Sequence, residues 1–208
     1  MSDLLGAMTQ WILQVVYSLG YPGVFALMAL SNLLLPIPSQ LVLPLAGFLV
    51  GKGQFSFSLV FLASTAGALA STLVLYALGR WVGEESLRAF VKRFGRFLLV
   101  GESDFYKASR WFERHGGKAV LIGRLVPGVG SLISVPVGAE RMPLARFLTY
   151  TTLGNCLWNG VFLGLGWAFG DEWTLVVRYA QPLQYALLAA AAGGVFWFFM
   201  RYRQGAQR

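Results

Sequence analysis

The stretch Tyr21–Gly51 reads YPGVFALMALSNLLLPIPSQLVLPLAGFLVG, and none of its 31 residues carries a charge. A helix needs about 20 apolar residues to cross the ~30 Å core of a bilayer, so this stretch is too long for one upright crossing and too short for two. Proline removes a backbone N–H and clashes with the preceding turn, so Pro36, Pro38 and Pro44 predict a break near the middle. We therefore expect a re-entrant hairpin over residues 22–51, with one kinked crossing helix as the alternative.

A second stretch, residues 119–139, reads AVLIGRLVPGVGSLISVPVGA and follows the same plan. Breaks are expected at Pro127–Gly128 and at Pro136, which again gives two arms shorter than a span. Such broken backbone is tolerated at membrane depth only where protein buries it or where it lines a watery cavity. Two breaks at corresponding positions of two repeats are typical of a transport site.

Each broken stretch is followed by an apolar run with the same glycine spacing. Eleven residues separate Gly67 from Gly79, and eleven separate Gly154 from Gly166. Coincidence in a chain with 25 glycines is the alternative, but order and spacing together favour a duplication. The first repeat would cover residues 1–85 and the second residues 119–172.

The absence of charge over long runs predicts an all-α polytopic membrane protein that forms a single membrane domain over residues 1–208. Three runs are long enough to be full transmembrane helices, at residues 55–79, 147–170 and 182–200. Two further segments, 1–19 and 86–98, place polar and apolar residues on opposite helical faces. Such amphipathic helices lie at the membrane interface.

The charge distribution predicts the orientation of these segments. Nine of the 17 basic residues lie in Arg80–Lys118, beside five acids, so the amphipathic loop over residues 86–118 should be cytoplasmic and face anionic lipid headgroups. If residues 119–139 enter from that side, the first hairpin must open on the other side. The two repeats would then be inverted.

Several functional classes are disfavoured. The net charge of +8 could suggest nucleic acid, but the concentration of basic residues in Arg80–Lys118 is typical of a cytoplasmic loop of a membrane protein, so a nucleic-acid partner is not expected. A single cysteine, Cys156, rules out an intrachain disulfide, and the lone His115 has no second ligand that would suggest a metal. No nucleophile–base pair or carboxylate cluster suggests an enzyme, and no cofactor is expected. Glycine pairs four residues apart favour close helix packing, either within the subunit or in a homo-oligomer.

Arg124 is the only charged residue within residues 119–139, and it lies close to the break expected at Pro127–Gly128. An arginine near mid-membrane costs ~2.5–3.5 kcal/mol, so it should face a cavity or a partner. Its planar guanidinium can bind a phosphate through two parallel hydrogen bonds, and broken helix ends offer free N–H groups to anions. The hypothesis is a contact with a lipid phosphate. The alternative is a structural arginine that caps carbonyls of the hairpin.

The run GRLVPGVGSLISVPVG over Gly123–Gly138, followed by Met142, Phe147, Gly154 and Trp158, resembles the second-half signature of the DedA family. In the first half, LPIPSQ and LPLAG resemble that family's P-P-x-P-S-E and P-x-A-G segments. The resemblance covers nearly the whole chain. It implies two opposed re-entrant hairpins and a role in moving lipids across the bacterial inner membrane, with undecaprenyl phosphate as the best-supported substrate and scramblase action in eukaryotic relatives.

Some charged positions of the family pattern are not matched. Gly130 stands where the family has a second arginine, Gln40 stands in place of the acid, and Ser31–Asn32 stand near another acid of the pattern. These departures place coupling to a proton or sodium gradient in doubt. The expected substrate-binding residues are Arg124, Pro127, Gly128, Gly130, Ser39, Gln40 and Asn32.

The expected function is therefore a flippase or uncoupled, scramblase-like transporter of an anionic lipid, most of all a polyprenyl phosphate. It would be a multi-pass protein of the bacterial inner membrane. The alternatives are a small-anion transporter, which would need a hydrophilic cavity, and a membrane assembly factor without transport, for which loss of Arg124 should be harmless.

Overall fold

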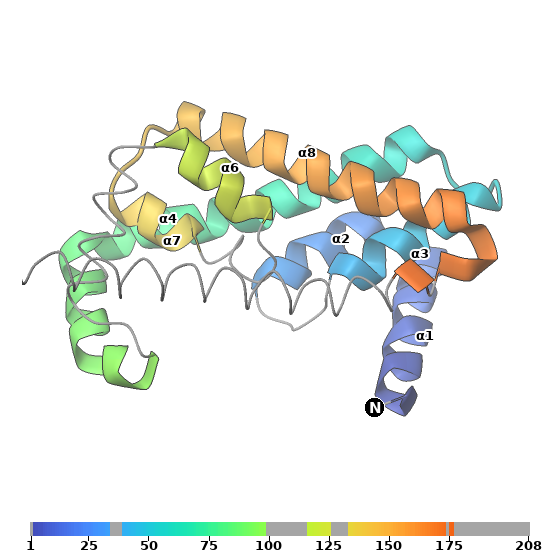
Figure 1. Ribbon diagram of the computed structural model, residues 1–208, viewed down its shortest axis with the longest axis horizontal. Coiled ribbons are helices and arrows are strands. Elements are labelled where there is room, and N and C mark those ends of the chain that lie inside the picture. Colours follow the sequence, from blue (N-terminus) through green and yellow to red (C-terminus); the bar gives the residue numbers. More distant parts are fainter. Residues whose placement is uncertain (1, 34–38, 99–115, 126–132, 174, 177–208) are drawn as a thin grey trace, which may run out of the picture.

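The computed structural model describes residues 2–33, 39–98, 116–125, 133–173 and 175–176 (Figure 1). These residues form helices and connecting turns and contain no strand, so the all-α class is confirmed for this part of the chain. The elements are α1 (Ser2–Leu19), α2 (Tyr21–Leu33), α3 (Ser39–Gly51), α4 (Phe57–Leu98), α6 (Gly117–Leu125), α7 (Ser134–Ala139), α8 (Leu144–Phe169) and the short 3₁₀ helix η1 (Gly170–Glu172).

The helices α4 and α8 run side by side along the length of the molecule, and shorter helices cover them (Figure 1). The helix α2 packs on α4 and α6 packs on α8, so the first arm of each broken stretch contacts the long helix that follows it. The second arms are exchanged, because α3 packs on α8 and α7 packs on α4. Each long helix is thus covered by one arm from each half of the chain.

Glycines allow the exchanged arms to approach closely. A Cβ atom added at Gly79 of α4 would overlap the carbonyl of Val135, and one added at Gly138 of α7 would overlap the carbonyl of Tyr76. The α3–α8 contact has the same character, since a Cβ atom at Gly47 or Gly166 would overlap backbone of the facing helix. Only residues without a Cβ permit such contact between backbones. Gly79 and Gly166, which occupy equivalent places in the sequence pattern, therefore serve packing within the subunit.

The two helix pairs open toward opposite ends of α4 and α8. At the end where α4 begins, the backbone N–H of Ser56 donates to the Tyr21 hydroxyl over 3.0 Å, so the start of α2 lies beside the turn after α3. At the same end, Lys52 pairs with Asp171, which follows α8. At the other end, a Cβ atom at Gly117 of α6 would meet the ring of Tyr150, near the start of α8.

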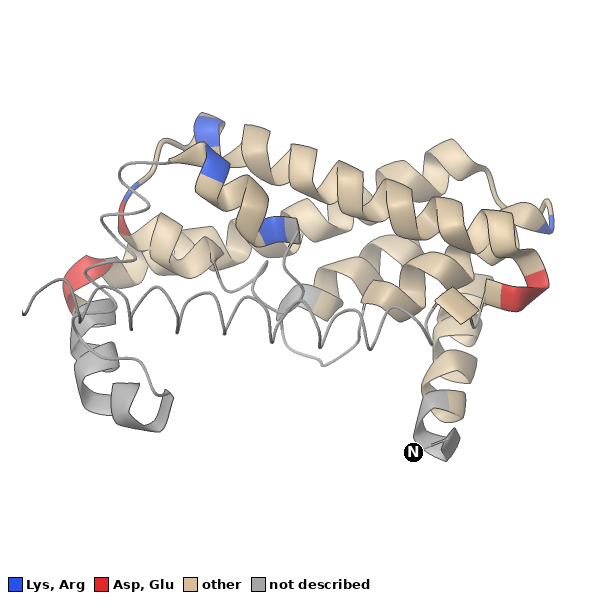
Figure 2. Ribbon diagram, in the orientation of Figure 1, with Lys and Arg blue, Asp and Glu red and all other residues tan. Residues whose placement is uncertain are grey.

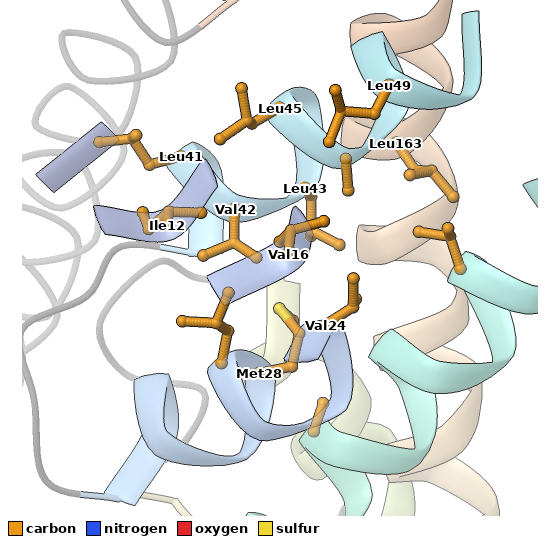
Figure 3. Packing of buried hydrophobic residues seen from close by; sticks show 14 residues of the cluster. Ile12, Val16, Val24, Met28, Leu41, Val42, Leu43, Leu45, Leu49 and Leu163 are labelled. Atoms are coloured by element: carbon orange, nitrogen blue, oxygen red, sulfur yellow. The ribbon is translucent and has the colours of Figure 1, made fainter. Parts of the chain in front are cut away.

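Two apolar clusters support this arrangement. The larger joins α1, α2, α3, α4 and α8 and includes Ile12, Val24, Leu43 and Leu163, all at most 1% exposed (Figure 3). The smaller one joins Tyr76 of α4 and Phe147 of α8, whose rings stack at 4.6 Å, to side chains of α6 and α7. The clusters lie toward the two ends of the helix pair, and the candidate site lies between them along α8.

Two proline breaks are not where the sequence places them. Pro44 lies inside α3, which continues to Gly51, so the expected break at this residue is wrong. A proline inside a helix forfeits one backbone hydrogen bond, and here α3 nevertheless continues and packs closely with Pro44 against Gly166 of α8. Pro136 is the third residue of α7, and the first turn is where proline is tolerated because its N–H would be unbonded in any case. Pro36, Pro38 and Pro127 lie outside the described residues.

The helix α4 continues well past the expected end of its span at residue 79. The chain bends at Gly83, whose φ of 74° and ψ of 164° interrupt the helical backbone. A positive φ of this kind favours glycine, which explains why the helix can bend here and continue. The expected amphipathic segment 86–98 is helical, as part of α4 beyond this bend.

The first amphipathic segment is also confirmed as a helix. In α1, Ile12 and Val16 are buried, whereas Gln10, Gln14 and Ser18 are exposed on the opposite face. This is the pattern of a helix with one apolar stripe. Its position at a membrane interface stays a prediction.

Side chains of α8 are distributed in the reverse of the usual soluble pattern. Leu153, Leu157 and Val161 follow one another at four-residue steps and are 55%, 54% and 48% exposed. Thr151 and Asn155, on another face of the same helix, are buried. A helix with apolar side chains outward and polar side chains inward suits a lipid surround, where exposed apolar surface carries no penalty.

Among the described residues, one helical segment, Phe57–Ser86 of α4, is long and apolar enough to cross a membrane. Two shorter apolar segments, Tyr21–Ser31 and Ser39–Gly51, belong to α2 and α3. The expected span at 147–170 corresponds to the continuous helix α8, while residues 182–200 lie outside the described part. Of the three full spans expected, the described part of the chain therefore contains one that is long and apolar enough to cross a membrane.

Candidate functional site

The candidate site is centred on Arg124, in the last turn of α6. Its side chain is only 8% exposed, and no other charged residue is buried in the described part of the chain. One guanidinium nitrogen, Nη2, donates a 2.7 Å hydrogen bond to the hydroxyl of Ser134 at the start of α7. The Nε atom is buried and has no hydrogen-bond partner among the described residues. The guanidinium, which carries five N–H donors, is thus bonded through Nη2, while its Nε–H donor has no partner among the described residues.

Glycine on α8 makes room for this arginine. A Cβ atom at Gly154 would lie 2.8 Å from Cβ of Arg124 and 3.2 Å from its Cγ. A Cβ atom at Gly123 would overlap the side chain of Ile133. These positions explain locally why α6 can lie against α8 and α7 with its arginine turned into the protein.

A stripe of polar side chains follows α8 past the arginine. Thr151, Asn155 and Asn159 are spaced four residues apart, so they share one face, and all three are buried. Asn159 Nδ2 donates to Thr65 Oγ1 of α4 over 3.2 Å. Thr151 Oγ1 and Asn155 Nδ2 are buried without a hydrogen-bond partner among the described residues.

The other expected site residues are placed less completely. Gln40 is buried near the start of α3, and Ser39, the first residue of that helix, is half-buried. Asn32 lies at the end of α2, and its side chain is outside what the structure describes. Pro127, Gly128 and Gly130 belong to residues 126–132 between α6 and α7, which are likewise outside it.

Sequence reasoning missed Ser134, Thr151, Asn155 and Asn159. The last three did leave a signal, because polar residues at positions i, i+4 and i+8 of an otherwise apolar run mark one helical face. Ser134 left none, since its pairing with Arg124 depends on how α6 and α7 meet.

Apart from Arg124 on α6, the described charged residues gather toward the two ends of the helix bundle (Figure 2). At one end, the Lys52–Asp171 pair has an N–O distance of 2.8 Å and is largely exposed. No carboxylate is buried among the residues that the structure describes. The same residues contain no group of three or more His, Cys, Asp or Glu side chains that could hold a metal ion.

This arrangement combines a buried guanidinium, hydroxyl and amide donors on the facing helix, and an apolar outer surface. It can bind an anion inside an apolar helical protein, because charge-assisted hydrogen bonds are strong where water is excluded. The described side chains around Arg124 supply donors and no buried negative charge.

Comparison with known proteins identifies the family. The model of the VTT domain matches residues 37–168, which is more than half of the chain. A protein of Lactococcus lactis subsp. cremoris (strain MG1363) called alkaline phosphatase-like protein is 37% identical over 190 residues, covering 91% of this chain and 88% of the relative. Undecaprenyl phosphate transporter A of Staphylococcus aureus (strain NCTC 8325 / PS 47) is 29% identical, covering 94% and 96% of the two chains.

The protein of the same name from Bacillus subtilis (strain 168) is 28% identical and covers 94% of this chain and 95% of its own. No solved structure matches the chain. The family match includes α3, α4, α6, α7 and nearly all of α8, and therefore the buried Arg124 and the polar stripe. The chain belongs to the VTT-domain, or DedA, family of membrane proteins.

Proposed function

We propose that this protein moves an anionic lipid of the polyprenyl phosphate class across the bacterial inner membrane, as a multi-pass transporter without enzymatic activity. Two relatives that align along nearly their whole length are named undecaprenyl phosphate transporter A, which supports this substrate class. The outward apolar face of α8 supports a position within lipid.

In this proposal, the pairs α2–α3 and α6–α7 are two re-entrant hairpins that enter the membrane from opposite faces. Their open ends lie at opposite ends of α4 and α8, which supports inverted repeats. Basic residues outnumber acids in the segment Arg80–Lys118 at the α6–α7 end, so this end would face the cytoplasm. The Lys52–Asp171 end would face outward.

The observation that carries the proposal is the buried, incompletely paired guanidinium of Arg124. A charged arginine within the bilayer costs ~2.5–3.5 kcal/mol even on the lenient insertion scale. Among the described residues, its hydrogen-bond partner is Ser134, which offers no opposite charge in return. A phosphate group brought in by the lipid supplies that charge, and the apolar tail can remain in the surrounding bilayer.

The test compares Arg124→Ala and Arg124→Lys with the wild-type protein in vesicles of defined lipids that contain polyprenyl phosphate. Arg124→Ala should weaken headgroup binding by ~1.5–3 kcal/mol, or roughly ten- to hundredfold, which is the range for hydrogen bonds to a charged group. Arg124→Lys should also be impaired, because an ammonium group lacks the planar fork. The matched control is Arg146→Ala, at an exposed position near the start of α8.

Thermal stability and yield are measured beside transport, because the structural alternative predicts that both Arg124 variants fail to fold. A well-folded Arg124→Ala protein that binds and moves the lipid at the wild-type rate would refute the phosphate contact. Transport of free phosphate or another oxyanion without movement of the lipid would favour a small-anion transporter.

A further inference from the structure

Three buried side-chain atoms of the described residues lack a hydrogen-bond partner, and they belong to neighbouring positions. They are Arg124 Nε, Thr151 Oγ1 and Asn155 Nδ2. Their side chains are 8%, 0% and 8% exposed, so water does not readily satisfy them. A buried donor without a partner is unfavourable, and a valine or leucine of similar shape would avoid the loss.

Gly154 is the point where Arg124 approaches the section of α8 that carries Thr151 and Asn155. Arg124 contacts α8 through its Cβ and Cγ atoms at this glycine. Thr151 lies three residues before Gly154 and Asn155 directly follows it, so both stand within about one helical turn, or ~5.4 Å along the axis. The three donors therefore flank one short section of α8.

Neighbouring hydroxyls behave differently. Thr149 donates to the carbonyl of Ala145, and on α4 Ser71 and Thr72 donate to the carbonyl of Ala68. Bonding back to the same helix is the ordinary solution for a hydroxyl on an apolar helix. Thr151 has the same opportunity and does not use it, which leaves its hydroxyl available to a ligand.

The contacts on either side hold this section in place. On one side Phe147 stacks on Tyr76, with ring centroids 4.6 Å apart. On the other side Asn159 donates to Thr65. Both contacts join α8 to α4, so Thr151 and Asn155 are held between two fixed points of the helix interface. Donors fixed in advance bind more strongly, because less order is lost on binding.

We propose that Arg124 Nε, Thr151 Oγ1 and Asn155 Nδ2 form a three-point donor site for the terminal phosphate of a monoester. A phosphate monoester has three terminal oxygens, one for each donor, whereas a phosphodiester has two non-bridging oxygens. Each proposed contact donates to the ligand, so an ionised phosphate satisfies all three. The inference rests on the proposed function and deepens it, since it separates lipid monoesters from the diester phospholipids of the surrounding bilayer.

The experiment uses the purified full-length protein in nanodiscs with Thr151→Val and Asn155→Leu, which remove the donors and keep the number and branching of the side-chain heavy atoms. The matched control is Thr72→Val, another buried threonine, whose hydroxyl is already bonded within α4. The probes are undecaprenyl phosphate and phosphatidic acid as lipid monoesters, phosphatidylglycerol as a diester, and inorganic phosphate as a free anion.

Each site variant should lose about ten- to hundredfold in affinity for the lipid monoesters, the range for one hydrogen bond to a charged group. Affinity for phosphatidylglycerol should change much less, so the preference for monoesters falls. The Thr72→Val variant should keep the wild-type affinity for the lipid monoesters and the wild-type preference for them. The site variants should also unfold at the wild-type temperature or above it, because they remove buried unpaired polar atoms.

Full monoester affinity and selectivity in Thr151→Val and Asn155→Leu would overturn the three-point site. If Arg124→Ala loses binding under the same conditions, the proposed function stands without the three-point site. Equal losses of affinity for monoesters and diesters in these two variants, together with lowered stability, would show a structural role for Thr151 and Asn155 and would also overturn the three-point site. Binding of inorganic phosphate that depends on Thr151 and Asn155, without binding of the lipids, would support the site and overturn the lipid substrate.

Discussion

Replacing Gly154 by alanine tests whether the close contact between α6 and α8 sets the position of Arg124. The new Cβ atom would lie 2.8 Å from Cβ of Arg124. Non-bonded carbon atoms are most favourable at ~3.5–4.0 Å, so α6 has to move away by roughly 1 Å. The neighbour is the first atom of a side chain, which cannot rotate out of the way without the backbone.

A matched control is present on the same helix. A Cβ atom at Gly164 would have nothing within 4 Å, and both glycines lie in the interior of α8. Each substitution gains ~0.5–1 kcal/mol because alanine is the better helix former. Only Gly154→Ala adds an overpacking penalty, which is typically ~1–3 kcal/mol. Since the gain is common to both, the two variants should differ by ~1–3 kcal/mol in free energy of unfolding.

The assay is unfolding of the purified variants in detergent, combined with titration of undecaprenyl phosphate. Gly164→Ala should be slightly more stable than wild type and bind normally. Gly154→Ala should be less stable than Gly164→Ala and bind about tenfold more weakly, which corresponds to ~1.4 kcal/mol, because a displaced guanidinium no longer aligns with the donors of α8. If both variants match in stability and in binding, the packing argument for this glycine is wrong.

Two further predictions concern the membrane. Single cysteines introduced at Lys52 and Arg141, in a background without the native cysteine, should react with a membrane-impermeant reagent from opposite sides; reaction of both from one side contradicts the inverted arrangement. Transport by the purified protein in vesicles should change little when a protonophore collapses the proton gradient, because Gln40 replaces the acid of the family pattern, and Gln40→Glu should introduce or strengthen gradient dependence. Loss of wild-type transport on addition of the protonophore would refute this explanation.

The sequence alone predicted the helices of the described part with useful accuracy. The first uncharged stretch became α2 and α3, and residues 147–170 became α8. These features are local, since apolar runs, prolines and glycines act on the backbone within one or two turns. The local prediction was wrong for Pro44, which lies inside a continuous helix and packs against Gly166, a residue far along the chain.

Arg124 could be singled out from the sequence because one charge in an apolar run is conspicuous on composition alone. Thr151 and Asn155 leave only a weaker signal, their four-residue spacing on one helical face, and this spacing does not show whether that face is buried. Their burial depends on which face of α8 is covered by α4 and α6, and that is decided by contacts between distant parts of the chain.

The exchange of arms between the two halves is likewise a property of the tertiary structure. Spacing indicated two similar halves, but nothing in it said that α3 would pack on α8 and α7 on α4. The glycines that permit this are visible in the sequence, while their partners are not, because a missing Cβ atom permits a close approach without specifying which backbone approaches. The sequence by itself thus determined the helices of the described part and the isolated charge at Arg124; the packing of distant helices decided that this charge is buried and which donors surround it.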